Sequence, residues 1–191
     1  MKLAKKKDKA KVVAILEKSF AENNTLLFLT RKKNRIRKVA EYAFEYAFRR
    51  KGVFLSDSEN GVAICYEYNK KKKDIIDYFN EFKLFISALS MKRIHRILSH
   101  TKRIENTRPK DGQFMYFWFF GAKPEKLKHN SAKELYLNIL KLAKKKHLNI
   151  YAETTILKNK NVYERFGFEV YKQWFNPHSG INVWFMRKIV T

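Results

Sequence analysis

Apolar residues follow two different spacings along this chain, and the two spacings predict an ordered mixture of helices and strands. Apolar residues that recur three or four positions apart are typical of a helix with one buried face. Continuous or alternating apolar runs between turn-forming residues indicate strands. The helical spacing covers residues of about 11–20, 33–50, 74–99, 131–146 and 161–166. The strand-like runs cover residues 53–56, 62–68, 114–120, 149–155, 168–174 and 182–189.

The predicted helix over residues 74–99 has an apolar face along its first part. Its last part is basic and carries His95, and we expect His100 at the helix end. We expect this segment to belong to a helical insertion of about residues 74–110. The apolar face consists of Ile75, Ile76, Phe79, Phe82, Phe85, Ile86 and Leu89.

The run over residues 114–120 is apolar at every position. Such a run predicts a central strand whose two faces are both covered. We find no internal repeat and no linker long enough to separate two domains. The sequence therefore predicts a single α/β domain over residues 1–191, a length that allows a sizeable core.

The chain is strongly basic, with 42 Lys and Arg against 18 Asp and Glu and a net charge of +24. The electrostatic field of a protein with this positive charge attracts nucleic acid and anionic surfaces. The alternative is a compositional bias, because lysine outnumbers arginine and Asn, Ile, Phe and Tyr are abundant, as an AT-rich coding sequence would give. The lysine runs at residues 5–7, 70–73 and 144–146 fall at expected helix ends or turns, where solvated charge is ordinary.

The cysteine and hydropathy patterns narrow the class of protein further. The single cysteine, Cys65, excludes an internal disulfide and a multi-cysteine zinc site, and its apolar neighbours predict a buried strand residue. No apolar run approaches the roughly 20 residues that span a bilayer. The basic start, residues 1–20, lacks the apolar length and cleavage site of a signal peptide. We therefore expect a cytoplasmic protein with no membrane partner.

Four short motifs follow one another in the second half of the chain. The most informative is residues 161–170, a short predicted helix that carries Tyr163, a stop at Gly167 and an apolar strand. Gly167 suits the left-handed backbone just past a helix end. The other motifs are GAKPE at 121–125, YAETT at 151–155 and WFMR at 184–187. Over residues 113–189 this pattern resembles the GCN5-related N-acetyltransferase (GNAT) superfamily, most closely its puromycin acetyltransferase-like branch.

The resemblance implies a fold and a co-substrate. The fold would be a mixed, mostly antiparallel twisted sheet flanked by helices. Its two central parallel strands, one ending near Phe120 and the other starting near Asn149, would separate to admit coenzyme A. The co-substrate would be acetyl-CoA, whose departing thiolate Tyr163 would protonate; the alternative is a core tyrosine whose hydroxyl is satisfied by a backbone group.

The resemblance also assigns further residues to the cofactor. Backbone groups around Phe120, Gly121 and Ala122 would hold the thioester and the pantetheine. Asn161 would touch the pantetheine or the loop around it, and a capping or turn role is the alternative.

The coenzyme A pyrophosphate needs converging backbone N–H groups at a helix N-terminus. The resemblance assigns this cradle to Leu127, Lys128, His129, Asn130, Ser131 and Ala132. The family has a polar residue where Leu127 stands and a glycine where Asn130 stands, whereas Ala132 fits the pattern. Asparagine tolerates left-handed dihedrals, so the turn can survive, although the Asn130 side chain would crowd a phosphate.

The base that would deprotonate the amine is not singled out by the sequence. Glu153 lies on the predicted strand beside the cofactor cleft, and we assign it to the catalytic site with Tyr163. Glu67, His95 and His100 are alternatives. No pair of His, Asp, Glu or Cys has metal-ligand spacing, so we expect no metal site.

The expected function is an N-acetyltransferase that moves an acetyl group from acetyl-CoA to a primary amine by direct attack. Residues 74–110 would shape the acceptor pocket, and a small amine, an antibiotic, a polyamine and a protein N-terminus all remain open as acceptors. The alternative is a degenerate GNAT scaffold that acts as a nucleic-acid-binding or other interaction module. That alternative draws on the net charge of +24 and on the altered loop.

Overall fold

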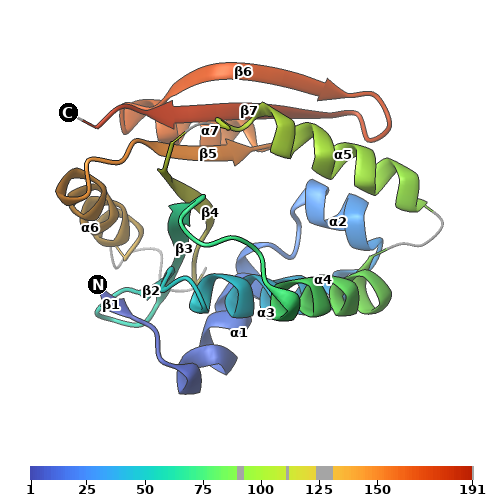
Figure 1. Ribbon diagram of the computed structural model, residues 1–191, viewed down its shortest axis with the longest axis horizontal. Coiled ribbons are helices and arrows are strands. Elements are labelled where there is room, and N and C mark those ends of the chain that lie inside the picture. Colours follow the sequence, from blue (N-terminus) through green and yellow to red (C-terminus); the bar gives the residue numbers. More distant parts are fainter. Residues whose placement is uncertain (90–92, 111, 124–130, 191) are drawn as a thin grey trace.

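One mixed sheet organises the molecule (Figure 1). The computed structural model describes residues 1–89, 93–110, 112–123 and 131–190. Its described strands form a seven-stranded sheet in the order β1-β2-β3-β4-β5-β7-β6, in which β4 and β5 are parallel and all other neighbours are antiparallel. The strands are β1 (Lys2–Leu3), β2 (Val53–Leu55), β3 (Gly61–Tyr68), β4 (Phe114–Ala122), β5 (Ile150–Thr154), β6 (Glu169–Asn176) and β7 (Ile181–Lys188).

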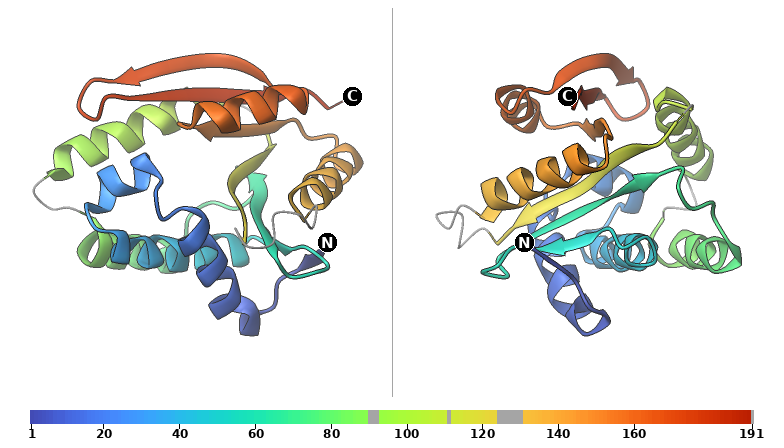
Figure 2. Two further views of the ribbon diagram at one scale, coloured as in Figure 1. Left: turned by 180° about the vertical axis from the view of Figure 1, so that it is seen from behind. Right: turned by 60° about the vertical axis from the view of Figure 1, so that its left-hand side comes forward.

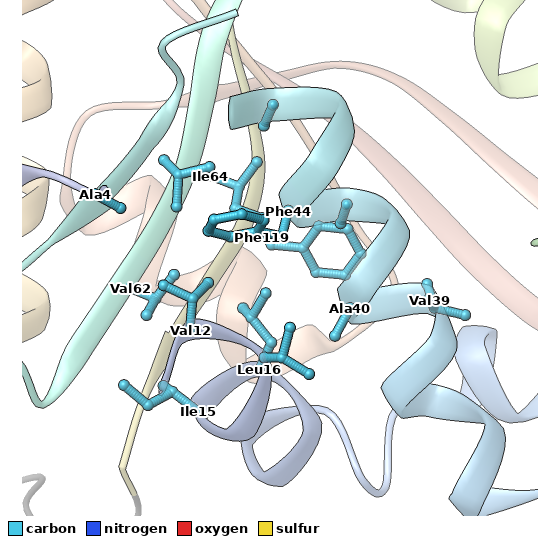
Figure 3. Close-up of a cluster of buried hydrophobic side chains, with 14 of the residues drawn as sticks. Ala4, Val12, Ile15, Leu16, Val39, Ala40, Phe44, Val62, Ile64 and Phe119 are labelled. Carbon is cyan, nitrogen blue, oxygen red and sulfur yellow. The ribbon is translucent and has the colours of Figure 1, made fainter. Parts of the chain in front are cut away.

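Helices cover both faces of this sheet (Figures 1 and 2). The described helices are α1 (Lys9–Ser19), α2 (Asn24–Thr30), α3 (Ile36–Phe48), α4 (Ile75–Ala88), α5 (Ile94–Thr107), α6 (Ser131–Lys145) and α7 (Leu157–Arg165). Apolar side chains of α1 and α3 meet β3 and β4 on one face, as Figure 3 shows for Leu16, Phe44 and Ile64. Leu135 and Ile139 of α6 pack on the opposite face, together with the partly buried Tyr163 of α7. The α/β fold with helices on both faces is therefore confirmed.

The expected stripe on the second helix is also confirmed. The side chains on α3 that face the core are Ile36, Val39, Ala40, Ala43, Phe44 and Ala47, and all of them are buried. They recur three or four positions apart, so one side of the helix is apolar and packs on the sheet.

The prediction of one continuous helix over residues 74–99 is wrong. Helix α4 ends at Ala88, because Leu89 takes an extended backbone with φ −81° and ψ 154°. A separate helix, α5, begins at Ile94 and continues to Thr107, so His100 lies inside a helix and not at its end. The two helices together form the insertion that we expected at about residues 74–110.

Smaller differences concern the ends of elements. Residues 26–29, to which the spacing assigned no element, lie in α2, whose first turn is capped by the side chain of Asn23. Helix α7 begins at Leu157, four residues before the expected start. The short β1 pairs with β2 and was not predicted, because two residues carry no readable alternation.

Candidate active site

The two central parallel strands pair over a short distance and then lose contact. The described pairs between β4 and β5 are Met115 with Ile150, Tyr116 with Tyr151 and Phe117 with Ala152. Beyond Phe117, β4 continues to Ala122 with β3 as its described partner strand. No described strand pairs with this half of β4 on its β5 side, so its backbone polar groups, apart from the Ala122 carbonyl that accepts from Ser19 Oγ, can hydrogen-bond a ligand.

A β-bulge marks the point of separation. On β3, Ile64 pairs with Phe119 and Cys65 pairs with Phe117, so Trp118 is the extra residue on β4. A bulge bends its strand and increases the local twist. It thereby gives a physical reason for β4 to leave β5 at this residue. Because residues 114–120 are apolar at every position, their pattern gave no sign of the bulge.

Helix α7 brings Tyr163 to the same place, on the face that α6 covers. The Tyr163 ring lies 6.2 Å from the Phe117 ring and 5.5 Å from the Phe168 ring, measured between centroids. Phe117 is the last residue of β4 that pairs with β5. Among the described residues, none forms a hydrogen bond with the Tyr163 hydroxyl.

The end of α7 fixes this tyrosine in place. Gly167 has a φ of +78°, as expected from the sequence, and the Phe168 N–H donates to the Tyr163 carbonyl at 3.0 Å. Burial raises the pKa of the Tyr163 phenol to about 12. The phenol therefore remains protonated at neutral pH and can act as a proton donor.

Glu153 lies on the opposite face, in a cluster of buried polar groups. Its carboxylate accepts hydrogen bonds from Arg108 Nε at 2.7 Å and from the Tyr116 hydroxyl at 2.6 Å. Burial alone would lower the pKa of the Arg108 guanidinium, but the charge and hydrogen bond of Glu153, together with the neighbouring Tyr116 and Tyr66, outweigh burial and raise it well above its usual value. Arg108 directly follows α5, so the helical insertion reaches the central strands through this ion pair.

The residues predicted to hold the thioester lie along the separated half of β4. Phe120 packs on Phe117, with ring centroids 5.0 Å apart. Gly121 is buried against the end of α1, and a Cβ built there would lie 2.7 Å from Ser19 Oγ. Ser19 Oγ also donates a hydrogen bond to the Ala122 carbonyl at 3.0 Å. Helix α1 thus holds the end of β4 in place.

Only part of the predicted pyrophosphate cradle belongs to the described residues. Leu127, Lys128, His129 and Asn130 lie outside them, so their role stays a prediction. Helix α6 begins at Ser131, as expected, and Ser131 Oγ shares a hydrogen bond with Ser58 Oγ at 3.0 Å. Ala132 is exposed in the first turn. Because α6 follows β4, its N-terminus lies at the end of the sheet where β4 and β5 separate (Figure 1).

The predicted cofactor residue Asn161 and the alternative bases Glu67 and His95 lie on three different elements. Asn161 is exposed on α7, and its carbonyl accepts from Arg165 Nε at 3.3 Å. Glu67 pairs across the sheet with Met115, at the end of β4 away from the separation, and binds Lys146. His95 is exposed on α5. The structure thus places neither Glu67 nor His95 beside Tyr163.

His100 is buried between α2, α5 and β6. One ring nitrogen, Nδ1, lies 2.9 Å from the Asn176 side-chain amide, and the other, Nε2, has no partner among the described residues. Burial lowers the pKa of His100, which favours the neutral ring. Trp184 of β7 pairs with Thr154, the last residue of β5, and with Gln173 of β6, so these two residues lie at the same level of the sheet. Asn176 lies three positions farther along β6 than Gln173. His100 therefore lies beyond the end of β5 and at a distance from the Glu153 cluster.

Cys65 is buried on β3, as expected, and burial raises the pKa of its thiol well above the usual value. Among the described residues, no group of three His, Cys, Asp or Glu side chains is arranged to bind a metal ion. None of the described helices is long and apolar enough to cross a membrane.

Comparisons with known proteins identify the fold. No sequence-family model and no curated protein matches the chain. Among solved structures, a histone acetyltransferase HPA2-related acetyltransferase from Corynebacterium glutamicum aligns with a TM-score of 0.69 and 18% identity over 100% of this chain and 95% of that chain. Arylalkylamine N-acetyltransferase 2 from Aedes aegypti aligns with a TM-score of 0.67 and 12% identity, over 100% of this chain and 98% of that chain. A polyamine N-acetyltransferase from Drosophila melanogaster aligns with a TM-score of 0.63 and 10% identity, over 96% of this chain and 95% of that chain.

At these identities the alignments establish the architecture. The chain has the fold of the GNAT acetyltransferases, as its motifs predicted. The separated strands, the bulge at Trp118 and Tyr163 on α7 are features of this chain itself, and they form the candidate active site.

Proposed function

We propose that this protein is an N-acetyltransferase that transfers an acetyl group from acetyl-CoA to a primary amine by direct attack. The observation that carries this proposal is the meeting of three features at Phe117: the end of β4–β5 pairing, the bulge at Trp118 and the ring of Tyr163. Unpaired backbone lies there beside a proton donor. Acyl transfer needs both, since one holds the thioester and the other protonates the leaving group.

In this proposal the cofactor occupies the face covered by α6 and α7. The α6 N-terminus and the residues before it would hold the pyrophosphate, where helix N–H groups favour negative charge. Residues Phe120 to Ala122 would hold the pantetheine and the thioester. Tyr163 would give its proton to the sulfur as the carbon–sulfur bond breaks. Asn161 would border the pantetheine from α7.

The acceptor would approach from the other face, where α1 and α3 pack. The Trp118 ring lies 6.1 Å from the Tyr42 ring and 5.8 Å from the Tyr46 ring, between centroids. Glu153 lies on the same face and would attract the amine or accept its proton. These groups suit an acceptor with an aromatic or aliphatic body and one amine. Arylalkylamines are the acceptors named for one structural neighbour, and they have this form.

A panel of amines tests the function directly. The protein is incubated with acetyl-CoA and with arylalkylamines, polyamines, aminoglycosides or peptides with free N-termini. Release of the coenzyme A thiol and the mass of the acetylated product are measured. We expect arylalkylamines to be acetylated fastest. If acetyl-CoA binds but no amine of any class is acetylated, the transferase proposal is wrong.

The interaction-module alternative rests on the net charge of +24. An electrophoretic mobility shift with RNA and DNA at physiological salt tests it, because charge-driven binding weakens as salt rises. Retardation of nucleic acid, together with no binding of acetyl-CoA, would favour this alternative. The puromycin acetyltransferase-like branch is likewise a proposal, and acetylation of an aminonucleoside antibiotic in the same panel would support it.

A further inference from the structure

Helix α4 presents large apolar side chains to solvent. Their exposed fractions range from 48 to 82%, and they are Ile75, Ile76, Tyr78, Phe79, Phe82 and Ile86. At such exposures each presents on the order of 100 Å². The patch therefore amounts to on the order of 600 Å², more than the few hundred Å² that monomeric proteins normally expose in one patch. Of the apolar face that the sequence pattern identified, the structure buries Leu89 and leaves Ile75, Ile76, Phe79, Phe82 and Ile86 exposed.

The opposite side of α4 is fixed to the rest of the molecule. Asp77 is buried and forms an ion pair with Arg50 of the α3 end at 2.7 Å. Ala88 is buried as well, and Leu84 packs against the same core. Figures 1 and 2 show α4 beside α3 at the periphery. Because Asp77 fixes the rotation of α4, the apolar face cannot turn inward without breaking a buried ion pair.

The centre of the exposed face has a symmetric sequence. Ile75, Phe79, Phe82 and Ile86 are separated by four, three and four positions, which places them in one stripe along the helix. The order Ile, Phe, Phe, Ile is the same in both directions. Two such stripes in antiparallel contact would set Ile75 against the partner's Ile86 and Phe79 against the partner's Phe82. The stripe is therefore complementary to itself.

We propose that two copies of this chain form a symmetric dimer through antiparallel contact of their α4 helices. A two-fold contact uses the same patch on both copies, so it requires the self-complementarity that this stripe has. A stable interface buries about 800 Å² per partner, and the apolar patch alone supplies most of that area. Interface centres are rich in aromatic residues and poor in charge, as this stripe is.

The charges of α4 favour a second copy over a lipid surface. Helices that lie on anionic bilayers carry Lys and Arg on their polar face. Helix α4 has Asp77, Glu81 and Lys83, so it is not a basic helix despite the charge of the whole chain. Asp77 points into the protein and Glu81 pairs with Lys73 at 2.6 Å. Neither acid would repel a second α4.

Sedimentation velocity of the full chain tests the dimer. At about 100 μM, where complexes of micromolar affinity are saturated, we expect the parent protein to be dimeric. Phe82→Glu should raise the dissociation constant at least about a hundredfold, because it places a charge at the centre of the contact. Phe175→Glu is the matched control: Phe175 lies on β6, is 55% exposed against 63% for Phe82, and gives the same change of charge.

Crosslinking tests the antiparallel geometry. Ile75→Cys and Ile86→Cys are made separately and oxidised alone and as a mixture. An antiparallel contact predicts crosslinked dimers in the mixture, whereas a parallel contact predicts them in each variant alone. The native Cys65 is buried and should give little background. Crosslinks in each variant alone, and none added by mixing, would overturn the proposed geometry.

Other outcomes overturn the dimer itself. A parent protein that stays monomeric at about 100 μM, or a Phe82→Glu variant that dimerises like the parent, contradicts it. A monomeric parent that sediments with phosphatidylserine vesicles, with Phe82→Glu remaining in solution, would assign the face to a bilayer. Circular dichroism checks that Phe82→Glu is folded. If it is not, Ile86→Lys, at a position that is 64% exposed, replaces it with the same expected loss of dimer.

Discussion

At the scale of single residues, Tyr163 is the group on which the proposed chemistry depends. Its pKa of about 12 keeps the phenol protonated, while a thiolate leaving group corresponds to a pKa of about 8.5. Tyr163→Phe removes the proton and keeps the ring that packs on Phe117. We expect kcat to fall roughly a hundred- to ten-thousand-fold. The KM for acetyl-CoA should change little, because the hydroxyl acts mainly as charge develops on sulfur.

Tyr136 provides the matched control for that measurement. It lies on α6 on the same face, and its hydroxyl donates to the Phe166 carbonyl at 2.8 Å. Tyr136→Phe removes an equivalent hydroxyl and should cost about 1 kcal/mol of stability, with kcat nearly unchanged. Equal losses of kcat in the two variants, at saturating substrate, would remove Tyr163 from the mechanism.

Glu153 gives a prediction about the stability of the fold. Its side chain is 13% exposed and that of Arg108 is 12% exposed. Glu153→Gln leaves the Arg108 charge unpaired, which costs about 3 kcal/mol for a buried pair. Urea unfolding measures the loss. Glu164→Gln, which breaks an exposed pair with Lys160, should change stability by less than about 1 kcal/mol. Similar changes for both variants would show that the Glu153 cluster does not stabilise the fold.

At the scale of elements, α4 is attached through a buried ion pair of Asp77 and through Ala88 and Leu84, while the stripe of Ile75, Phe79, Phe82 and Ile86 stays exposed. Burial alone would raise the pKa of the Asp77 carboxyl, but the hydrogen bond and charge of Arg50 outweigh burial and lower it. A carboxyl with a lowered pKa stabilises the fold above its unfolded pKa of about 3.9, and that stabilisation is lost as the pH falls through the folded pKa.

Substitution of Asp77 tests this attachment. At pH 7, Asp77→Asn should lower the free energy of unfolding by about 3 kcal/mol, since it leaves Arg50 buried and unpaired. The difference from the parent should shrink as the pH falls below the unfolded pKa of about 3.9 toward the lowered folded pKa, because the unfolded chain then binds a proton that the folded carboxylate has to release. Urea unfolding at several pH values measures it. A difference that does not depend on pH would show that the ion pair is not its origin.

Elements were predictable from the sequence where local patterning decides them. The stripe on α3 and the left-handed glycine after α7 depend on neighbours a few positions away, so both were found. The bulge at Trp118 and the pairing of Glu153 with Arg108 depend on strand register and on contacts 45 positions apart, which no local pattern encodes. The face of α4 shows a further limit, because an apolar stripe looks the same whether it packs on a core or on a second molecule.

At the scale of the whole molecule, the sheet organises the fold, whereas the net charge affects which ligands the protein attracts. The sheet of β1 to β7 runs through the whole described chain, and we propose that residues 1–191 form one domain around it. The net charge of +24 attracts any polyanion, including coenzyme A. Binding of acetyl-CoA therefore has to be separated from simple attraction of phosphate before it can support the proposed function.

Thermal unfolding with matched ligands makes that separation. Acetyl-CoA at about 100 times its dissociation constant should stabilise the folded state by about 2.7 kcal/mol, a rise in Tm of roughly 5–10 °C for a chain of this size. Inorganic tripolyphosphate carries comparable charge but no pantetheine, so its effect should disappear as sodium chloride screens the charges. The acetyl-CoA shift should persist, since pantetheine would also contact the unpaired backbone of β4 after Phe117. If both ligands lose their effect together as salt rises, acetyl-CoA is bound only as a polyanion, and the interaction module becomes the better description of this molecule.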